Sequence, residues 1–365
     1  MKRVLIIDLG KDFGGAEKHV IKLCSLIKSD FSVYLLVRHK SPLHKKSLEL
    51  DVEDVLSIDY SAKSFFKDVL RTKKFIEKNN ITIVHSHGIN SEFFVYTLKP
   101  FLKEKNIKCI TTVHGIAEMD RVQKSTIEQK IFSKLQIIAL KRIDSIIAVS
   151  KSIKKDLEKK GIDKNKIVII YQSAIDNKIE DKEEYILHKP IRLCCVGRLE
   201  LVKNYSYIID LLSSMTDNNN YICDIYGDGS LKSLLEDEIK EKKIEHIIKI
   251  KGYVDNVETI YKNHDILIQP SIYESFGLSI VEAMIYGIPV ICSKVGGITE
   301  IVEDKITGFL FDLNSKNELA TLLRDIYNER YNLCEIVKNA QRFVEQNFKD
   351  ENYKENIMKI YNGEN

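Results

Sequence analysis

Short apolar runs and amphipathic stretches alternate along the first half of the chain. The run at 3–9 leads through a glycine turn into an amphipathic stretch at about 16–28, and a helical stretch at 62–79 precedes the run at 81–87. Continuous apolar runs between helices are typical of strands in a parallel sheet that is covered on both faces. The expected strands of this half are 3–9, 32–37, 81–87, 107–115, 144–150 and 166–171.

A polar, charged and aperiodic segment at 172–190 interrupts the alternation, as a domain linker would, and the same pattern then starts again. The elements expected after it are strands at 191–197, 221–227, 247–252, 265–270 and 288–293, and helices at about 203–215, at 230–243, within 269–291, at 315–329 and over most of 330–361. The pattern predicts an α/β protein of two doubly wound, Rossmann-like domains. Their expected bounds are 1–180 and 181–348, with a C-terminal helix at 349–365. Ligands of such sheets bind at the carboxyl ends of the strands, so facing domains would place the site in the cleft between them.

Length and composition agree with two soluble domains. A chain of 365 residues exceeds one comfortable core, and 44% hydrophobic with 30% charged residues is a globular composition. No apolar run reaches the ~18 residues of a transmembrane helix, and the N-terminal run reads as a strand, not as a signal peptide. The seven cysteines show no metal-ligand or redox spacing. We therefore expect a cytoplasmic protein with reduced cysteines and no cofactor.

The net charge of +3 conceals an asymmetry between the halves. Residues 1–180 hold 34 Lys and Arg against 22 Asp and Glu, a balance of +12, which leaves −9 for the remainder. Basic clusters at 38–46, 71–74 and 150–160 contribute to this excess. We expect the first domain to dock on an anionic membrane surface, the inner face of the cell membrane. The alternative is a solubilising surface; nucleic acid is not expected, because no aromatic-interleaved basic platform is visible.

Two glutamates stand out in the segment QPSIYESFGLSIVEAMIYGIPVI at 269–291. Glu282 lies within an apolar helix, and Glu274 lies in the loop before it. A buried carboxylate is costly unless it accepts hydrogen bonds. One interpretation is a ligand with hydroxyl groups, since a carboxylate can accept two of them at once. The other is a partner within the protein, either a backbone group or a lysine.

Cations and glycines follow the expected strand ends. Arg198 leaves the strand at 191–197, and Lys203 follows five residues later at the expected start of a helix. Two cations there are placed to neutralise a diphosphate, unless they are solvated surface charges. Gly14 and Gly15 precede a helix whose free N–H groups favour an anion, although their spacing is not the G-x-G-x-x-G dinucleotide signature. Similar glycine turns recur at 227–235 and 295–302.

Taken together, these stretches resemble the retaining glycosyltransferases of family 4, which have the GT-B fold. The matching stretches are GGAE, VHSHG, TTVHG, VGRLELVKN, GDGSL, GYV, PSIYESFGLSIVEAMIYGIPVI, VGGITEIV and GFLF, and they span essentially the whole chain. The Glu-x7-Glu element together with the Arg and Lys pair is the specific part of the resemblance.

The resemblance implies a role for each of these residues. Glu274 would hold the hydroxyl groups of the donor sugar, and Glu282 would hold the ribose hydroxyls of the nucleotide. Arg198 and Lys203 would bind the pyrophosphate, and His114 would lie near the donor sugar. The implied catalytic set is Glu274, His114, Arg198 and Lys203. The implied donor-binding set is Gly14, Gly15, Arg198, Lys203, Tyr253, Val254, Glu274, Phe276, Gly277, Leu278 and Glu282.

The implied activity is the transfer, with retention, of a hexosyl or N-acetylhexosaminyl group from a nucleotide sugar, expected to be a UDP-sugar. The acceptor would be a glycan or a lipid-linked molecule in bacterial cell-surface polysaccharide synthesis. No D-x-D motif is present, so we expect metal-independent transfer and no metal site. Two alternatives are a GT-B nucleotide-sugar epimerase, which needs no acceptor, and a non-catalytic sugar-nucleotide-binding subunit.

Two further expectations concern segments outside this donor set. The fold implies that the last helix packs back on the first domain, with Ile357, Ile360 and Tyr361 supplying its apolar stripe. His85 and His87 are interpreted as structural or acceptor-side residues.

Overall fold

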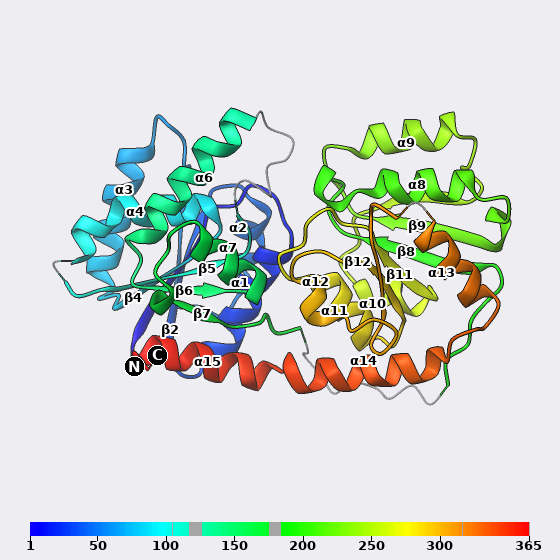
Figure 1. Cartoon of the computed structure of the whole chain (residues 1–365). Coiled ribbons are helices and arrows are strands. Elements are labelled where there is room, and N and C mark those ends of the chain that lie inside the picture. Colours follow the sequence, from blue (N-terminus) through cyan, green and yellow to red (C-terminus); the bar gives the residue numbers. More distant parts are fainter. Residues whose placement is uncertain (104, 117–125, 175–183, 316, 365) are drawn as a thin grey trace. The chain divides into compact units, whose positions relative to one another are not determined.

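The computed structural model describes residues 1–103, 105–116, 126–174, 184–315 and 317–364. It divides into two compact units: unit 1 comprises Met1–Ser173 and Asp350–Asn365, and unit 2 comprises Ala174–Lys349 (Figure 1). The first boundary thus precedes the expected one at 180, and residues 175–183 of the expected linker lie outside the described residues. The second boundary, between Lys349 and Asp350, lies one residue beyond the expected one.

In the described residues of unit 1, seven parallel strands form a sheet in the order β3-β2-β1-β4-β5-β6-β7. The strands are β1 (Arg3–Asp8), β2 (Ser32–Arg38), β3 (Asp54–Ile58), β4 (Ile83–His87), β5 (Lys108–Val113), β6 (Ser145–Ala148) and β7 (Ile167–Ile169). The helices are α1 (Gly15–Ile27), α2 (Pro42–Ser47), α3 (Phe65–Lys78), α4 (Ile89–Lys103), α6 (Thr126–Lys141), α7 (Lys151–Lys159) and α15 (Asp350–Asn362). The strand order reverses between β1 and β4, so the carboxyl ends of these two strands flank the usual ligand crevice.

The C-terminal helix α15 belongs to unit 1 and lies beside α1 (Figure 1). Its side chains Tyr353, Ile357, Ile360 and Tyr361 are buried in one core with apolar residues of α1 and of the sheet. Lys2, the residue before β1, donates a hydrogen bond from Nζ to the carbonyl oxygen of Tyr361 in α15 over 3.2 Å. The first and last segments of the chain therefore share one core.

In the described part of unit 2, six parallel strands form a sheet in the order β10-β9-β8-β11-β12-β13. The strands are β8 (Ile191–Val196), β9 (Tyr221–Tyr226), β10 (Ile248–Gly252), β11 (Ile266–Gln269), β12 (Val290–Ser293) and β13 (Phe309–Phe311). The helices are α8 (Tyr205–Ser214), α9 (Lys232–Glu241), α10 (Val257–Lys262), α11 (Leu278–Ile285), α12 (Ile298–Ile301), α13 (Glu318–Tyr327) and α14 (Leu333–Asn347). The order reverses between β8 and β11, which places the expected ligand crevice at their carboxyl ends.

The predicted α/β class with two doubly wound parallel sheets is confirmed. The hydropathy pattern missed β3 and β13, each of which lies at an edge of its sheet. In β3 only Ile58 is buried, because an edge strand is covered less completely and carries a mixed polar pattern. Within the described residues, no helix is long and apolar enough to cross a bilayer.

Candidate functional site

The loop after β11 and the turn after β8 meet at the reversal point of the unit 2 sheet. Glu274 lies in the loop, and Lys203 ends a 3₁₀ turn, Leu201–Lys203, that precedes α8. Lys203 Nζ donates to Glu274 Oε2 over 2.5 Å, and the two side chains are only 14% and 15% exposed. The backbone N–H of Ile272 also donates to the carbonyl oxygen of Val202 over 2.8 Å. Two residues predicted separately thus form one ion pair at the carboxyl edge of the sheet.

The glycines at 295–302 support the Glu274 loop from behind. A Cβ on Gly296 would lie 2.2 Å from the carbonyl oxygen of Glu274, and one on Gly297 would lie 2.3 Å from that of Ser275. The N–H of Gly297 donates to the Glu274 carbonyl over 2.8 Å. Only a residue without a side chain permits this approach, so we assign this pair a role in placing Glu274.

The glycines at 227–235 support the Arg198 turn in the same way. A Cβ on Gly227 would lie 1.8 Å from the carbonyl oxygen of Gly197, and one on Gly229 would lie 2.5 Å from that of Leu199. Backbone hydrogen bonds from Leu199 to the carbonyl of Asp228 and back from Leu231 to that of Leu199 complete the contact. The Arg198 side chain itself is exposed, and no ion pair is found for it among the described residues.

Glu282 lies on α11 and is partly buried. Its Oε2 accepts a hydrogen bond from the hydroxyl of Tyr261 over 3.2 Å. Burial and then the charge of Glu282 raise the pKa of Tyr261 well above its usual value, so this phenol stays a hydrogen-bond donor. A partner within the protein therefore exists for the carboxylate, as one of the two interpretations required.

The remaining predicted donor residues lie around these two glutamates. Phe276 is buried against Phe348, with ring centres 5.4 Å apart, and Gly277 caps α11 with a φ of +110°, a conformation that favours glycine. Tyr253 and Val254 follow β10, and Tyr253 is 48% exposed. Burial, its bond to Asp255 and the nearby charges of Asp255 and Glu282 raise the pKa of Tyr253 to about 12.

In unit 1 the Gly-Gly-x-Glu stretch forms the start of α1. Gly14 is the N-cap, and its N–H donates to Glu17 Oε2 over 2.8 Å, as in a capping box. A Cβ on Gly10 would lie 2.4 Å from Glu17 Oε1, so this carboxylate sits close to the end of β1. Burial, with a smaller contribution from Glu17, raises the pKa of Asp8 to about 7. The glutamate of the stretch therefore has a structural role in the helix start.

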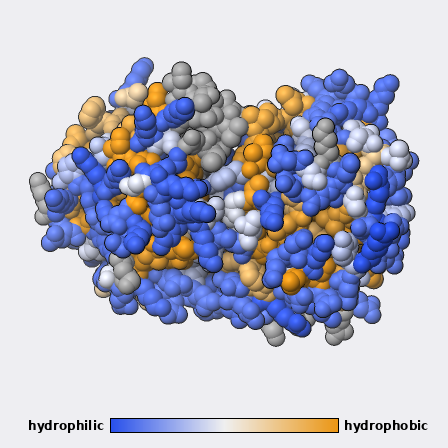
Figure 2. Space-filling view, viewed as in Figure 1, coloured by the Kyte–Doolittle hydropathy of each residue, from blue (hydrophilic) through white to orange (hydrophobic). Residues whose placement is uncertain are grey.

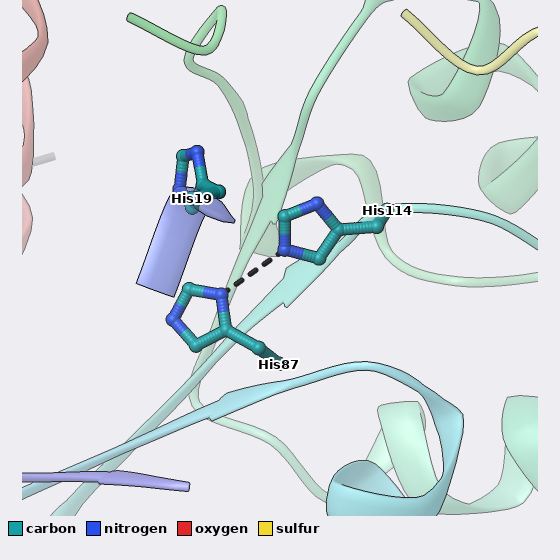
Figure 3. A group of neighbouring side chains, drawn as sticks. All are labelled: His19, His87 and His114. Atoms are coloured by element: carbon teal, nitrogen blue, oxygen red, sulfur yellow. Dashed lines mark hydrogen bonds between the residues drawn. The ribbon is translucent and has the colours of Figure 1, made fainter. Parts of the chain in front are cut away.

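Three histidines from different elements gather at the carboxyl edge of the unit 1 sheet (Figure 3). His19 lies on α1, His87 ends β4 and His114 directly follows β5. His87 Nδ1 lies 3.1 Å from His114 Nε2, and His114 Nδ1 lies 2.7 Å from the side-chain amide nitrogen of Gln172. His19 Nε2 contacts the hydroxyl of Tyr353 at 2.7 Å.

Burial is the main cause that keeps these rings neutral. It lowers the pKa of His114 to about 4 and holds the pKa values of His19 and His87 well below their usual range. His85 behaves likewise, with a pKa lowered to about 3, and bonds to Tyr361 and Thr112 over 2.7 and 2.8 Å. His85 thus ties β4 to α15 and β5.

Sequence reasoning proposed His114 but missed its surroundings. His19 lies two residues after the GGAE stretch without any spacing signal, and Gln172 was assigned to the linker. Both ring nitrogens of His114 already have protein partners, a fact that only the fold reveals. His87, interpreted as structural or acceptor-side, belongs to this cluster.

Comparison with known proteins places the chain in a family. The family model for glycosyltransferase family 4 matches residues 13–173, and that for glycosyl transferases group 1 matches residues 176–350. A Klebsiella pneumoniae protein described as an uncharacterized 41.2 kDa protein in cps region is 28% identical over 316 residues, with 82% of this chain and 83% of that protein covered.

Two further similar proteins carry more specific descriptions. The UDP-Gal:alpha-D-GlcNAc-diphosphoundecaprenol alpha-1,3-galactosyltransferase of Escherichia coli is 24% identical, with 84% of this chain and 82% of that protein covered. The crystal structure of Anabaena HepE in complex with UDP-glucose matches with a TM-score of 0.84 at 18% identity, and all of both chains is covered.

The fold, with two doubly wound parallel sheets, is that of the GT-B glycosyltransferases. The chain belongs to glycosyltransferase family 4. Its predicted class, a glycosyltransferase, is confirmed by these matches.

Proposed function

We propose that the protein transfers a hexosyl or N-acetylhexosaminyl group from a UDP-sugar to a glycan or lipid-linked acceptor in bacterial cell-surface polysaccharide synthesis, with retention and without a metal. The observation that carries the proposal is the Lys203–Glu274 ion pair at the reversal point of the unit 2 sheet. The names of the cps-region and galactosyltransferase relatives support the substrate class, and the complex of HepE with UDP-glucose supports uracil as the base.

The ion pair arranges opposite charges for two parts of one donor. Lys203, together with the exposed Arg198, would neutralise the diphosphate, while Glu274 would accept hydrogen bonds from the sugar hydroxyls. Glu282 would accept those of the ribose, and Tyr253 with Val254 would lie beside the base. Phe276, Gly277 and Leu278 would offer the backbone N–H groups of the first turn of α11 to the phosphates.

The configuration of the anomeric carbon would be retained because the acceptor attacks this carbon from the same face that the leaving group departs from. The acceptor oxygen would form a bond to the anomeric carbon as the bond from that carbon to the diphosphate oxygen breaks. The acceptor proton would pass to the departing phosphate oxygen. Fixed cations and backbone dipoles would stabilise the charge that develops there.

The decisive experiment follows nucleotide release from UDP- and GDP-sugars with and without glycan and lipid-linked acceptors. Acceptor-dependent release of UDP with an α-linked product from an α-linked donor is the expected result. Conversion of the UDP-sugar, without any acceptor, to a second UDP-sugar or to free UDP with an epimerised sugar would instead indicate an epimerase. Binding measured by thermal shift without any turnover would indicate a non-catalytic subunit.

An anionic membrane surface is the proposed docking partner of unit 1. The helices α3, α4 and α6 pack side by side, and apolar residues interrupt the hydrophilic surface over this region (Figure 2). On α6, Ile131, Leu135 and Ile138 are 51%, 37% and 48% exposed at helical spacing, with Lys134 exposed among them. A face that combines apolar and basic side chains is typical of helices that lie in a bilayer interface.

Vesicle co-sedimentation tests this docking. Binding should require anionic lipid and weaken as salt rises, and Ile138→Asp should reduce it. Ile306→Asp, which alters an isoleucine of unit 2 that is 44% exposed, serves as the matched control and should bind like the wild type. Equal binding to neutral vesicles, or no effect of Ile138→Asp, would exclude this surface.

A further inference from the structure

The spacing of His19, His87 and His114 matches three imidazoles around one metal ion. Their ring centres are 5.1, 5.4 and 5.6 Å apart, nearly an equilateral triangle. Imidazoles that each place one nitrogen ~2.0–2.1 Å from a tetrahedral zinc ion have ring centres roughly 5 Å apart. One nitrogen of each residue lies within 4.8 Å of those of the other two.

The hydrogen bonds divide the ring nitrogens into an inner and an outer set. Tyr353 occupies His19 Nε2 and Gln172 occupies His114 Nδ1, so the inner nitrogens are His19 Nδ1 and His114 Nε2. His87 contributes Nδ1, which already faces His114 Nε2 at 3.1 Å. Metal-ligating histidines characteristically have such a partner on the outer nitrogen, because it fixes the orientation of the ring.

His87 differs from the other two histidines at its outer nitrogen. Its side chain is fully buried, and its Nε2 has no hydrogen-bond partner among the described residues. A buried polar atom of this kind costs free energy unless a further group compensates it. Asp8, whose Cα pairs with that of His87 on the neighbouring strand, adds a buried carboxylate to the same edge of the sheet.

We propose that His19, His87 and His114 bind one divalent transition-metal ion. Zinc serves as the example, because it is one of the metals that imidazole binds well. Three protein ligands leave one tetrahedral position open. The proton on His114 Nε2, which His87 Nδ1 accepts in the metal-free protein, moves by exchange with solvent to His114 Nδ1, so the ring stays neutral, and the Gln172 amide turns its oxygen to accept from Nδ1–H. Zinc thereby holds His114 and inhibits the transfer; this consequence, unlike the binding itself, rests on the proposed function.

The test titrates the chelator-treated full chain with Zn²⁺ by calorimetry and with Co²⁺ by visible absorption. We expect one equivalent per chain, the absorption bands of tetrahedral Co²⁺ and a raised melting temperature. His87→Ala and His19→Ala should abolish all three. His44→Ala should abolish none, although the surface rings of His39 and His44 are also 5.3 Å apart, because that pair lacks a third histidine.

A variant outside the ligand set tests the site while it keeps all three histidines, in case the histidine variants do not fold. Gln172→Ala should retain one equivalent but bind it ~10- to 100-fold more weakly, as loss of an outer partner does. Melting curves without metal establish that each variant is folded. Stoichiometric binding that survives in folded His87→Ala, binding lost in His44→Ala, or no binding by the wild type at micromolar metal would each overturn the proposal. These readouts need no substrate, so a failed transferase assay leaves them unchanged.

Discussion

Replacing Lys203 by methionine removes the cation of the Lys203–Glu274 pair and keeps most of the side-chain volume. The Nζ–Oε2 distance is 2.5 Å and both side chains are about 15% exposed, so Glu274 would keep its burial and lose this cation. We expect the free energy of unfolding to fall by ~1.5–3 kcal/mol, the range for hydrogen bonds to charged groups. Urea denaturation followed by circular dichroism measures the change.

Unit 2 offers a matched control at the same distance. Lys262 Nζ and Glu258 Oε1 are also 2.5 Å apart, but their side chains are 58% and 40% exposed. Lys262→Met should therefore cost only ~0.3–0.5 kcal/mol, as exposed helical pairs do. The difference between the two variants isolates the effect of burial from that of distance.

The same substitution tests the donor site. If Lys203 binds the diphosphate, its loss should lower kcat/KM by roughly ten- to hundredfold, which is the kinetic equivalent of ~1.5–3 kcal/mol. The assay measures nucleotide release from a UDP-sugar, without urea and at a temperature where the variant stays folded. Turnover within twofold of the wild type, together with the expected loss of stability, would show that the pair is purely structural and refute the assignment.

Three further predictions concern the glutamates, metals and pH. Glu282→Ala should weaken UDP binding by roughly tenfold or more, and Tyr261→Phe, which removes one hydrogen bond to Glu282, should weaken it less; thermal-shift titration with UDP measures both, and the reverse order would contradict the assignment. Transfer should persist in EDTA, and complete loss with recovery in Mg²⁺ or Mn²⁺ would contradict metal independence. Burial holds the pKa values of His85 and His114 at about 3 and 4, below the ordinary 6.5. Between these folded and unfolded pKa values the unfolded chain binds more protons than the folded one, so these two groups destabilise the fold as pH falls from 7 to 5. Asp8, with its pKa raised to about 7, acts in the opposite direction. The measurement therefore compares how steeply the free energy of unfolding changes with pH in the wild type and in a folded His85→Gln variant, and the variant should show the shallower slope.

Burial on both faces gives a strand its clearest signal in the sequence, as β1 shows. In β1 every residue from Val4 to Asp8 is buried, so the apolar run is continuous and unambiguous. The strand β3 lacks this signal, because only Ile58 in it is buried, and β13 has only three residues, Phe309–Phe311, so neither was predicted. The helix expected from 203 begins only at Tyr205, because the preceding residues form a 3₁₀ turn that places Lys203 toward Glu274.

The site could be predicted where its chemistry lies in local stretches. Glu274, Glu282, Arg198 and Lys203 each belong to a recognisable stretch, but the contact between Lys203 and Glu274 joins residues 71 positions apart. The interpretation of the glutamates stayed open for this reason: partners inside the protein and hydroxyl groups of a ligand both satisfy a carboxylate. The structure shows a partner inside the protein for each carboxylate, Lys203 for Glu274 and Tyr261 for Glu282.

The histidine cluster lay beyond sequence reasoning because no two of its members share an element. His114 also shows why a residue match alone does not define a role. Its Nδ1 and Nε2 are both within hydrogen-bond distance of protein groups, so it can reach a donor sugar only by releasing Gln172 or His87. A contact of Nε2 with the sugar and a bond of Nε2 to a metal ion are therefore mutually exclusive. If His114 acts in the proposed transfer through Nε2, zinc bound at that nitrogen would inhibit the reaction.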